Sequence, residues 1–125
     1  MQYYCPACFA EISFADRDKT CTVCGTVAAE WERTHSYTER LFHALTHPLS
    51  EVRMAAIISL GNRREPLAAV PLAECALAHP IDVVQALEIV RSVRKLPVGP
   101  ERATALTLLA QHPARAVREA VAALA

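Results

Sequence analysis

The hydrophobic pattern repeats along the chain from residue 47 onward. A His-Pro pair opens each unit, in "HPLSEVRMAAIISLG", "HPIDVVQALEIVRSV" and "HPARAVREAVAALA". The pairs begin at His47, His79 and His112, so the spacings are 32 and 33 residues. Apolar residues recur at helical spacing after each pair. A period in this range is typical of stacked helix pairs.

Each His-Pro pair also has a local meaning. Proline disfavours α geometry in the residue before it, but it is tolerated in the first turn of a helix. We therefore interpret His47, His79 and His112 as helix boundaries rather than as ligands or bases.

These boundaries divide the second part of the chain into helices. Ser36 and Glu39 form a capping box that predicts a helix start, and Gly61 in "GNRREP" predicts a helix end. The expected fold class is mainly α, a short α-solenoid. Its six helices are expected near residues 37–46, 49–61, 68–78, 81–95, 100–111 and 114–124.

The first two units carry a family resemblance. "EVRMAAIISLG" followed by "REPLAAVPLAECALAHP" resembles HEAT-like repeats of the phycobilisome-lyase type, and the likeness covers about 80 residues. The resemblance implies an α-solenoid with a surface for a ligand or a protein. Some members belong to enzymes that attach bilins, but no catalytic motif of theirs matches this chain. An accessory lyase or a cofactor-insertion chaperone stays open as an alternative.

The first 34 residues have a different pattern, "CPAC" and "CTVC" separated by twelve residues. Residues 9–14 alternate like a strand, and a second strand is expected from Thr26. Pro6 suits a tight turn, and Gly25 allows a positive φ. Two such turns facing each other would supply four sulfur ligands in tetrahedral geometry.

The paired cysteines resemble those of the zinc-ribbon family. The resemblance covers residues 1–34 and implies a small β domain in front of a helical domain over residues 35–125. So short a segment cannot bury a self-sufficient core, which favours a structural zinc ion over a redox pair or disulfides. Iron is less favoured, and a catalytic zinc is disfavoured because four thiolates leave no open position. The expected ligands are Cys5, Cys8, Cys21 and Cys24.

Composition restricts the partners and the location. The 125 residues include 13 basic and 13 acidic side chains, and aromatic residues make up 6%. A neutral chain of this kind does not attract nucleic acid strongly. The longest uncharged run, residues 103–114, is too short to span a membrane. No secretion signal opens the sequence, so we expect a cytoplasmic protein.

Two surface features bear on function. The second helices of the repeats are poor in charge, and they either pack closely or expose an apolar groove. Four basic residues at matching helix ends are expected to form a positive ridge, namely Arg63, Arg64, Arg94 and Lys95. The leading hypothesis is a non-enzymatic protein-interaction scaffold that binds a protein partner or a second copy of itself. Nucleic-acid binding through the ribbon and the ridge is the alternative.

Overall fold

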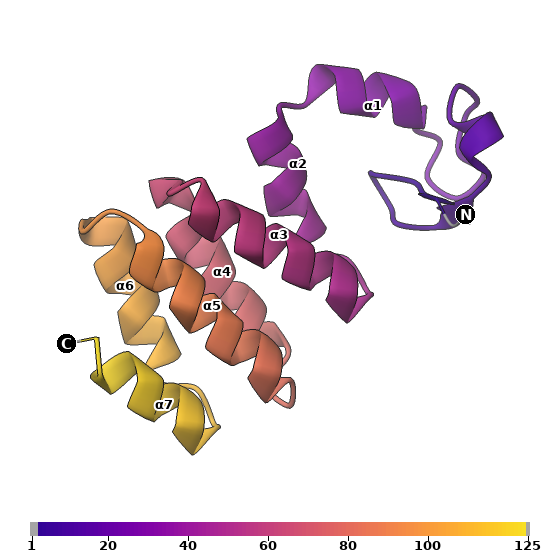
Figure 1. The fold of residues 1–125 in the computed structure, drawn as a ribbon. Helices are drawn as coiled ribbons and strands as arrows, with labels where there is room; N and C mark the ends of the chain where they lie inside the picture. The colour runs from indigo at the N-terminus through magenta and orange to yellow at the C-terminus, as the bar shows by residue number, and fades with distance from the viewer. Residues whose placement is uncertain (1–2, 125) are drawn as a thin grey trace.

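The computed structural model describes residues 3–124 and is mainly helical (Figure 1). Its N-terminal part contains β1 (Tyr3–Tyr4), β2 (Glu11–Ile12) and a 3-10 turn, η1 (Phe14–Asp16). The helices are α1 (Ala28–Thr34), α2 (Tyr37–Ala44), α3 (Ser50–Asn62), α4 (Ala69–Ala78), α5 (Val83–Lys95), α6 (Pro100–Leu109) and α7 (Arg115–Ala122), with the 3-10 turn η2 (Pro66–Ala68) before α4. In the described part of the chain, no helix combines the length and the apolar character that crossing a membrane requires.

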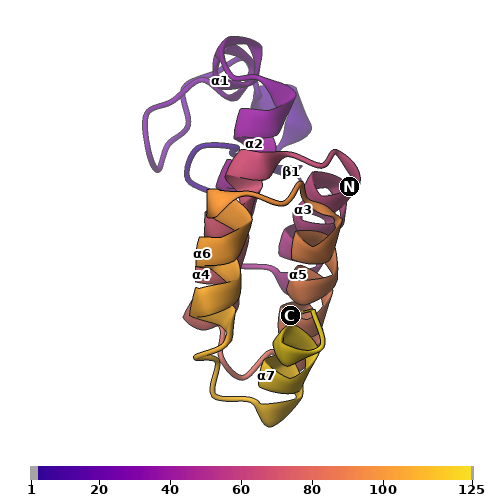
Figure 2. The same ribbon diagram turned by 90° about the vertical axis from the view of Figure 1, so that its left-hand side faces the viewer.

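The repeated units form a two-layer stack. Helices α3, α5 and α7 lie side by side in one layer, and α4 and α6 form the other (Figure 2). Helix α2 packs against α3. The α3–α4 and α5–α6 connections lie at one end of the stack, and the His-Pro turns lie at the opposite end (Figure 1). This is the helix-pair arrangement predicted from the repeat.

A continuous apolar core runs through the stack, from Leu41 in α2 to Val121 in α7. The two predicted second helices differ in burial. Half of the residues of α4 are buried, namely Ala69, Leu72, Ala73, Cys75 and Ala76, whereas the buried residues of α6 are Ala105 and Leu109. The low charge of α4 therefore reflects close packing of small side chains, while most residues of α6 keep some exposure.

Helix boundaries follow the predicted signals, with one informative exception. The capping box is present: the Glu39 N–H donates to Ser36 Oγ at 3.1 Å, and the Ser36 N–H donates to Glu39 Oε1 at 2.9 Å. Gly61, however, does not end its helix. Helix α3 continues through Asn62, and a Cβ at position 61 would lie 2.8 Å from Ser92 Cβ and 2.9 Å from Ser92 Cα. The glycine is there because α3 and α5 approach closely.

The His-Pro turns do mark boundaries, and two of their histidines are buried. The Leu49 N–H donates to His47 Nδ1, and the Ala114 N–H donates to His112 Nδ1, each at 3.0 Å. Each ring thus accepts a backbone hydrogen bond just before the following helix begins. Burial lowers the pKa of both His47 and His112, so both rings are neutral at neutral pH.

The N-terminal part differs from the prediction in its second strand. Strands β1 and β2 pair antiparallel, with Tyr3 opposite Ile12, but the predicted strand over residues 9–14 shrinks to two residues. The strand predicted from Thr26 is wrong. Only an isolated bridge joins Thr20 to Val27, and helix α1 follows at once. Its sequence, "AAEWERT", is rich in good helix formers, and these outweigh the weak alternation that suggested a strand.

Candidate metal centre

Two short hairpin tips hold the four N-terminal cysteines, and their backbones match. In the first tip the Cys5 N–H donates to Ala10 O at 2.8 Å and the Phe9 N–H donates to Cys5 O at 2.7 Å. In the second, the equivalent bonds run from Cys21 N–H to Thr26 O at 2.8 Å and from Gly25 N–H to Cys21 O at 2.9 Å. The two Cys-x-x-Cys segments therefore have the same backbone hydrogen bonds and form two equivalent turns, as the sequence predicts.

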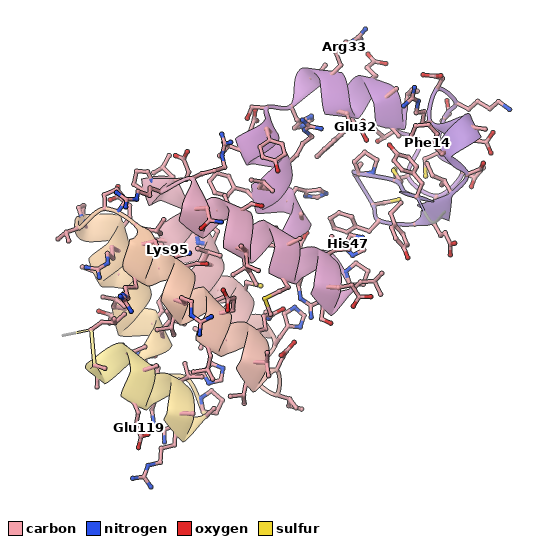
Figure 3. All side chains as sticks on the ribbon, viewed as in Figure 1. Phe14, Glu32, Arg33, His47, Lys95 and Glu119 are labelled. Atoms are coloured by element: carbon pink, nitrogen blue, oxygen red, sulfur yellow. The ribbon has the colours of Figure 1, made fainter. Side chains whose placement is uncertain are left out.

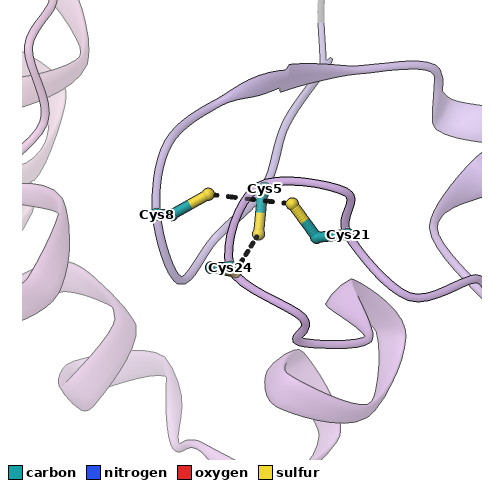
Figure 4. Close-up of side chains that lie close together, drawn as sticks. All are labelled: Cys5, Cys8, Cys21 and Cys24. Atoms are coloured by element: carbon teal, nitrogen blue, oxygen red, sulfur yellow. Dashed lines mark hydrogen bonds between the residues drawn. The ribbon is translucent and has the colours of Figure 1, made fainter.

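The two tips face each other and bring the four sulfurs together (Figure 4). All four Sγ atoms lie within 4.8 Å of one another. Cys5 Sγ lies 3.7 Å from Cys24 Sγ, and Cys8 Sγ lies 3.8 Å from Cys21 Sγ. A tetrahedral ion with metal–sulfur bonds of about 2.3 Å holds its ligands about 3.8 Å apart. A disulfide requires about 2.05 Å, and all five cysteines are free. The four thiols could therefore hold one metal ion.

Hydrogen bonds from the Thr26 hydroxyl and from backbone N–H groups favour the thiolate form in the second tip. The Thr26 hydroxyl and N–H, which hydrogen-bond the sulfur, lower the pKa of Cys24 to about 6. The backbone N–H groups of Cys24 and Val23 likewise lower the pKa of Cys21. Thiolates are the form in which cysteine binds metals. The second tip is thus electrostatically prepared for a cation.

The thiols of the first tip are less solvated, and their pKa values are raised rather than lowered. Burial raises the pKa of Cys5, and backbone hydrogen bonds only partly oppose this effect. For Cys8, a backbone hydrogen bond at Ala10 lowers the pKa, but burial and the other three thiols raise it to about 12. In the absence of a cation, crowding thus works against ionising all four sulfurs together. A bound cation would remove that conflict.

The first tip also contacts the helical stack, through residues that the sequence analysis did not single out. Phe9 has a φ of 66° where the second tip has Gly25 at 77°. Its ring centroid lies 4.7 Å from that of His43 and 4.5 Å from that of His47. His43 Nε2 donates to Ala7 O at 2.8 Å. Figure 3 shows His47 between α3 and the cysteine hairpins.

This junction has a signal in the sequence. Aligning "CPACFA" with "CTVCGT" puts phenylalanine where the repeated turn needs a left-handed residue. A bulky residue in that conformation costs on the order of 1 kcal/mol or more, so its presence indicates a compensating contact. The sole tryptophan, Trp31, stacks on His35 at a centroid distance of 4.0 Å and lies 5.3 Å from His43. The aromatic residues of the N-terminal part therefore face the stack as well as their own hairpins.

The other predicted site residues lie far from the sulfurs. Arg63, Arg64, Arg94 and Lys95 are all exposed, and all lie at the C-terminal ends of α3 and α5. Cys75 is a buried residue of α4 whose thiol donates to Leu45 O at 3.5 Å. Burial raises the pKa of Cys75, which fits the predicted role as a packing residue.

Comparison with known proteins adds one finding. A family model described as HEAT repeats matches residues 13–91, which is more than half of the chain. No curated protein and no solved structure matches. The match agrees with the predicted helical repeats. The finer resemblances, to a zinc ribbon and to lyase-type repeats, stay predictions.

Proposed function

The chain belongs to the HEAT-repeat family, and on that premise we propose that it is a non-enzymatic scaffold that binds another protein. HEAT repeats stack helix pairs into extended surfaces, and these surfaces serve recognition rather than chemistry. Three residues of reactive type have structural roles: Cys75 is buried in the core, and His47 and His112 accept backbone hydrogen bonds at helix boundaries.

We further propose that the N-terminal segment, residues 1–34, is a zinc ribbon attached to the helical domain of residues 35–125. The observation that supports this most directly is the spacing of the sulfurs, 3.7 and 3.8 Å between facing tips. Zinc and iron both accept four thiolates, and zinc is the usual ion of closed structural sites. With four protein ligands the ion has no position for water or substrate, so its role is to fold the segment.

The proposal is tested by metal analysis combined with Trp31 fluorescence. Trp31 is the only tryptophan and packs against histidines between the hairpins and the stack. Freshly purified protein should contain one zinc per chain, and a chelator should shift the Trp31 emission while helical circular dichroism is largely kept. Protein without metal, or Trp31 emission that a chelator leaves unchanged, would refute the structural zinc.

Scaffolding is a separate claim and needs its own measurement. The structure offers a chemically defined surface for that purpose, at the end of the stack away from the His-Pro turns.

A further inference from the structure

Four basic residues form one surface, which we call the helix-end ridge: Arg63, Arg64, Arg94 and Lys95. The α3–α4 and α5–α6 connections lie next to each other at the same end of the stack (Figures 1 and 2). Lys95 Nζ donates to Asn62 Oδ1 at 2.9 Å, so the last residues of α3 and α5 are in direct contact (Figure 3 labels Lys95). The helix ends that carry the four cations are therefore adjacent, with the Arg63 guanidinium on the α2 side, where it donates to Thr38 Oγ1 at 3.1 Å and lies over the Tyr37 ring.

The helix-end ridge gathers, at one end of the stack, four exposed cations that form no ion pair with any described residue. Four exposed basic residues elsewhere pair with carboxylates: Lys19 with Asp16, Arg33 with Glu30, Arg91 with Glu88 and Arg115 with Glu119. Two others do not, because Arg17 lies over the Phe14 ring and Arg118 donates to the carbonyls of His112 and Pro113. In the part of the chain that the structure describes, no ridge residue forms such an ion pair. Helix dipoles favour cations at C-terminal ends. They do not explain why every carboxylate partner is missing at this end.

Arg64 adds a second, independent observation. It follows α3 with a φ of 51°, a conformation that glycine or asparagine normally takes after a helix. An arginine there costs on the order of 1 kcal/mol relative to glycine. A strained backbone that keeps an exposed charged side chain is typical of a binding surface rather than of a stabilising contact.

Exposed apolar side chains stand in the same two connections. Leu67, in η2, is 62% exposed, and Val98, between α5 and α6, is 88% exposed. Each lies three residues from the nearest ridge cation in the sequence. The end of the stack thus combines exposed apolar side chains with positive charges that form no ion pair within residues 3–124.

We propose that the helix-end ridge binds an acidic segment of a partner protein that also carries apolar side chains. This inference rests on the proposed scaffold function and names its surface. Carboxylates of the segment would pair with the four cations, and its apolar side chains would cover Leu67 and Val98. A nucleic acid fits less well, because the chain is neutral overall and the nearby aromatic ring, Tyr37, lies under the guanidinium groups of Arg63 and Arg40.

Binding of a defined peptide to the full zinc-loaded chain tests the proposal. The probe is a short labelled peptide of glutamate and leucine, measured by fluorescence anisotropy at low and moderate salt. We expect saturable binding that weakens with salt. Replacing the leucines with serine should weaken it further, because the contacts with Leu67 and Val98 are lost. Single-stranded DNA of similar charge serves as the competing ligand.

Two variants make the result specific. Reversing two ridge charges, Arg94→Glu with Lys95→Glu, should weaken binding by about tenfold or more. Arg64→Gly should raise thermal stability because it relieves the positive φ, and should still weaken the peptide binding. Arg115→Glu in α7, which removes an exposed ion-paired cation outside the ridge, is the control and should bind like the wild type.

Three results would overturn the proposal. They are no binding of the peptide, equal binding by the charge-reversal variant, or tighter binding of the DNA than of the peptide. Zinc content and Trp31 emission of the same preparation report on the ribbon independently. If the zinc-loaded, folded protein does not bind the peptide, the result therefore refutes the docking surface alone.

Discussion

The two ends of this chain are stabilised in different ways. In the cysteine segment, residues 3–27, the buried side chains are Cys5 and Cys21. In the helical stack, fully buried residues such as Ile57, Leu72 and Ile89 join α2 through α7 in one core. The first region has almost no apolar interior, so we expect its fold to depend on the sulfurs and on its contacts with the stack. The second has enough interior to fold by burial.

This contrast explains why aromatic and imidazole rings form the junction between the cysteine segment and the helical stack. Phe9 brings an aromatic face from the cysteine segment to His43 and His47, and His43 returns a hydrogen bond to Ala7 O. A segment without its own core is thereby given contacts on the stack. If the two regions are stabilised in these different ways, removing one cysteine sulfur should unfold the cysteine segment and leave the helical stack folded.

The largest expected effect is that of Cys21→Ser, matched with Cys75→Ser. Both side chains are buried, but Cys21 belongs to the sulfur cluster and Cys75 to the apolar core. Cys21→Ser should abolish metal retention and unfold the cysteine segment, because structural zinc sites supply most of the folding free energy of such segments. Cys75→Ser should keep the metal and cost about 1 kcal/mol. Metal content and Trp31 emission measure the difference; retention of metal by Cys21→Ser would contradict the comparison.

The next effect lies within the stack and compares two repeats of one motif. Arg53 and Arg118 each donate from Nη1 to both carbonyls of the preceding His-Pro pair. Arg53 is buried and also donates from Nε to Gln85 Oε1 at 2.7 Å, whereas Arg118 is exposed. Arg53→Met leaves buried acceptors without a donor and should cost about 2–4 kcal/mol, against less than about 1 kcal/mol for Arg118→Met. Urea unfolding measures both, and similar losses would show that burial does not set the strength of this motif.

The repeated pattern was sufficient to predict the stack. Helices near 37–46, 49–61, 81–95 and 100–111 are observed within two residues of each predicted end, because proline and the capping box act locally. The equivalence of Arg53 and Arg118 also follows from the repeat. Their difference in burial does not, since it depends on what packs against each helix.

The features that the sequence did not reveal have different physical causes. The helix end predicted at Gly61 lies one residue from the observed end, but the reason for the glycine is Ser92, which lies 31 residues away in the sequence. The left-handed residue after α3 is Arg64, which no propensity favours. The strand expected from Thr26 is instead helix α1, because a weak alternation over a few residues does not distinguish the two structures. The sulfur cluster was predictable because four identical ligands at fixed spacing restrict the geometry strongly.

A smaller effect tests the close approach of α3 and α5. Gly61→Ala would place a Cβ within 3.0 Å of Ser92 backbone and side-chain atoms, so the two helices must separate. We expect a loss of about 1–3 kcal/mol. Gly99→Ala is the matched control, because its nearest neighbour would be Glu101 Oε2 at 3.5 Å and its φ is extended. Thermal unfolding should separate the two variants; equal stability would mean that α5 adjusts without cost.

The smallest expected effect concerns pH and the far end of the stack. Burial, together with the charge of Arg118, lowers the pKa of His112 below its ordinary value of 6.5. Below that value the unfolded chain binds more protons than the folded chain, so this histidine makes stability fall as the pH drops below about 6.5 and has no effect above it.

His112→Asn isolates the contribution of this ring. The asparagine oxygen can accept the Ala114 N–H, which donates to His112 Nδ1 at 3.0 Å, but it cannot titrate. Urea midpoints should therefore fall less steeply for the variant than for the wild type between about pH 7 and pH 5.5. If a metal is bound by the cysteines, its loss in acid affects both proteins alike, so it cancels in the comparison. Identical slopes would mean that His112 stays accessible to protons in the folded stack, against its complete burial.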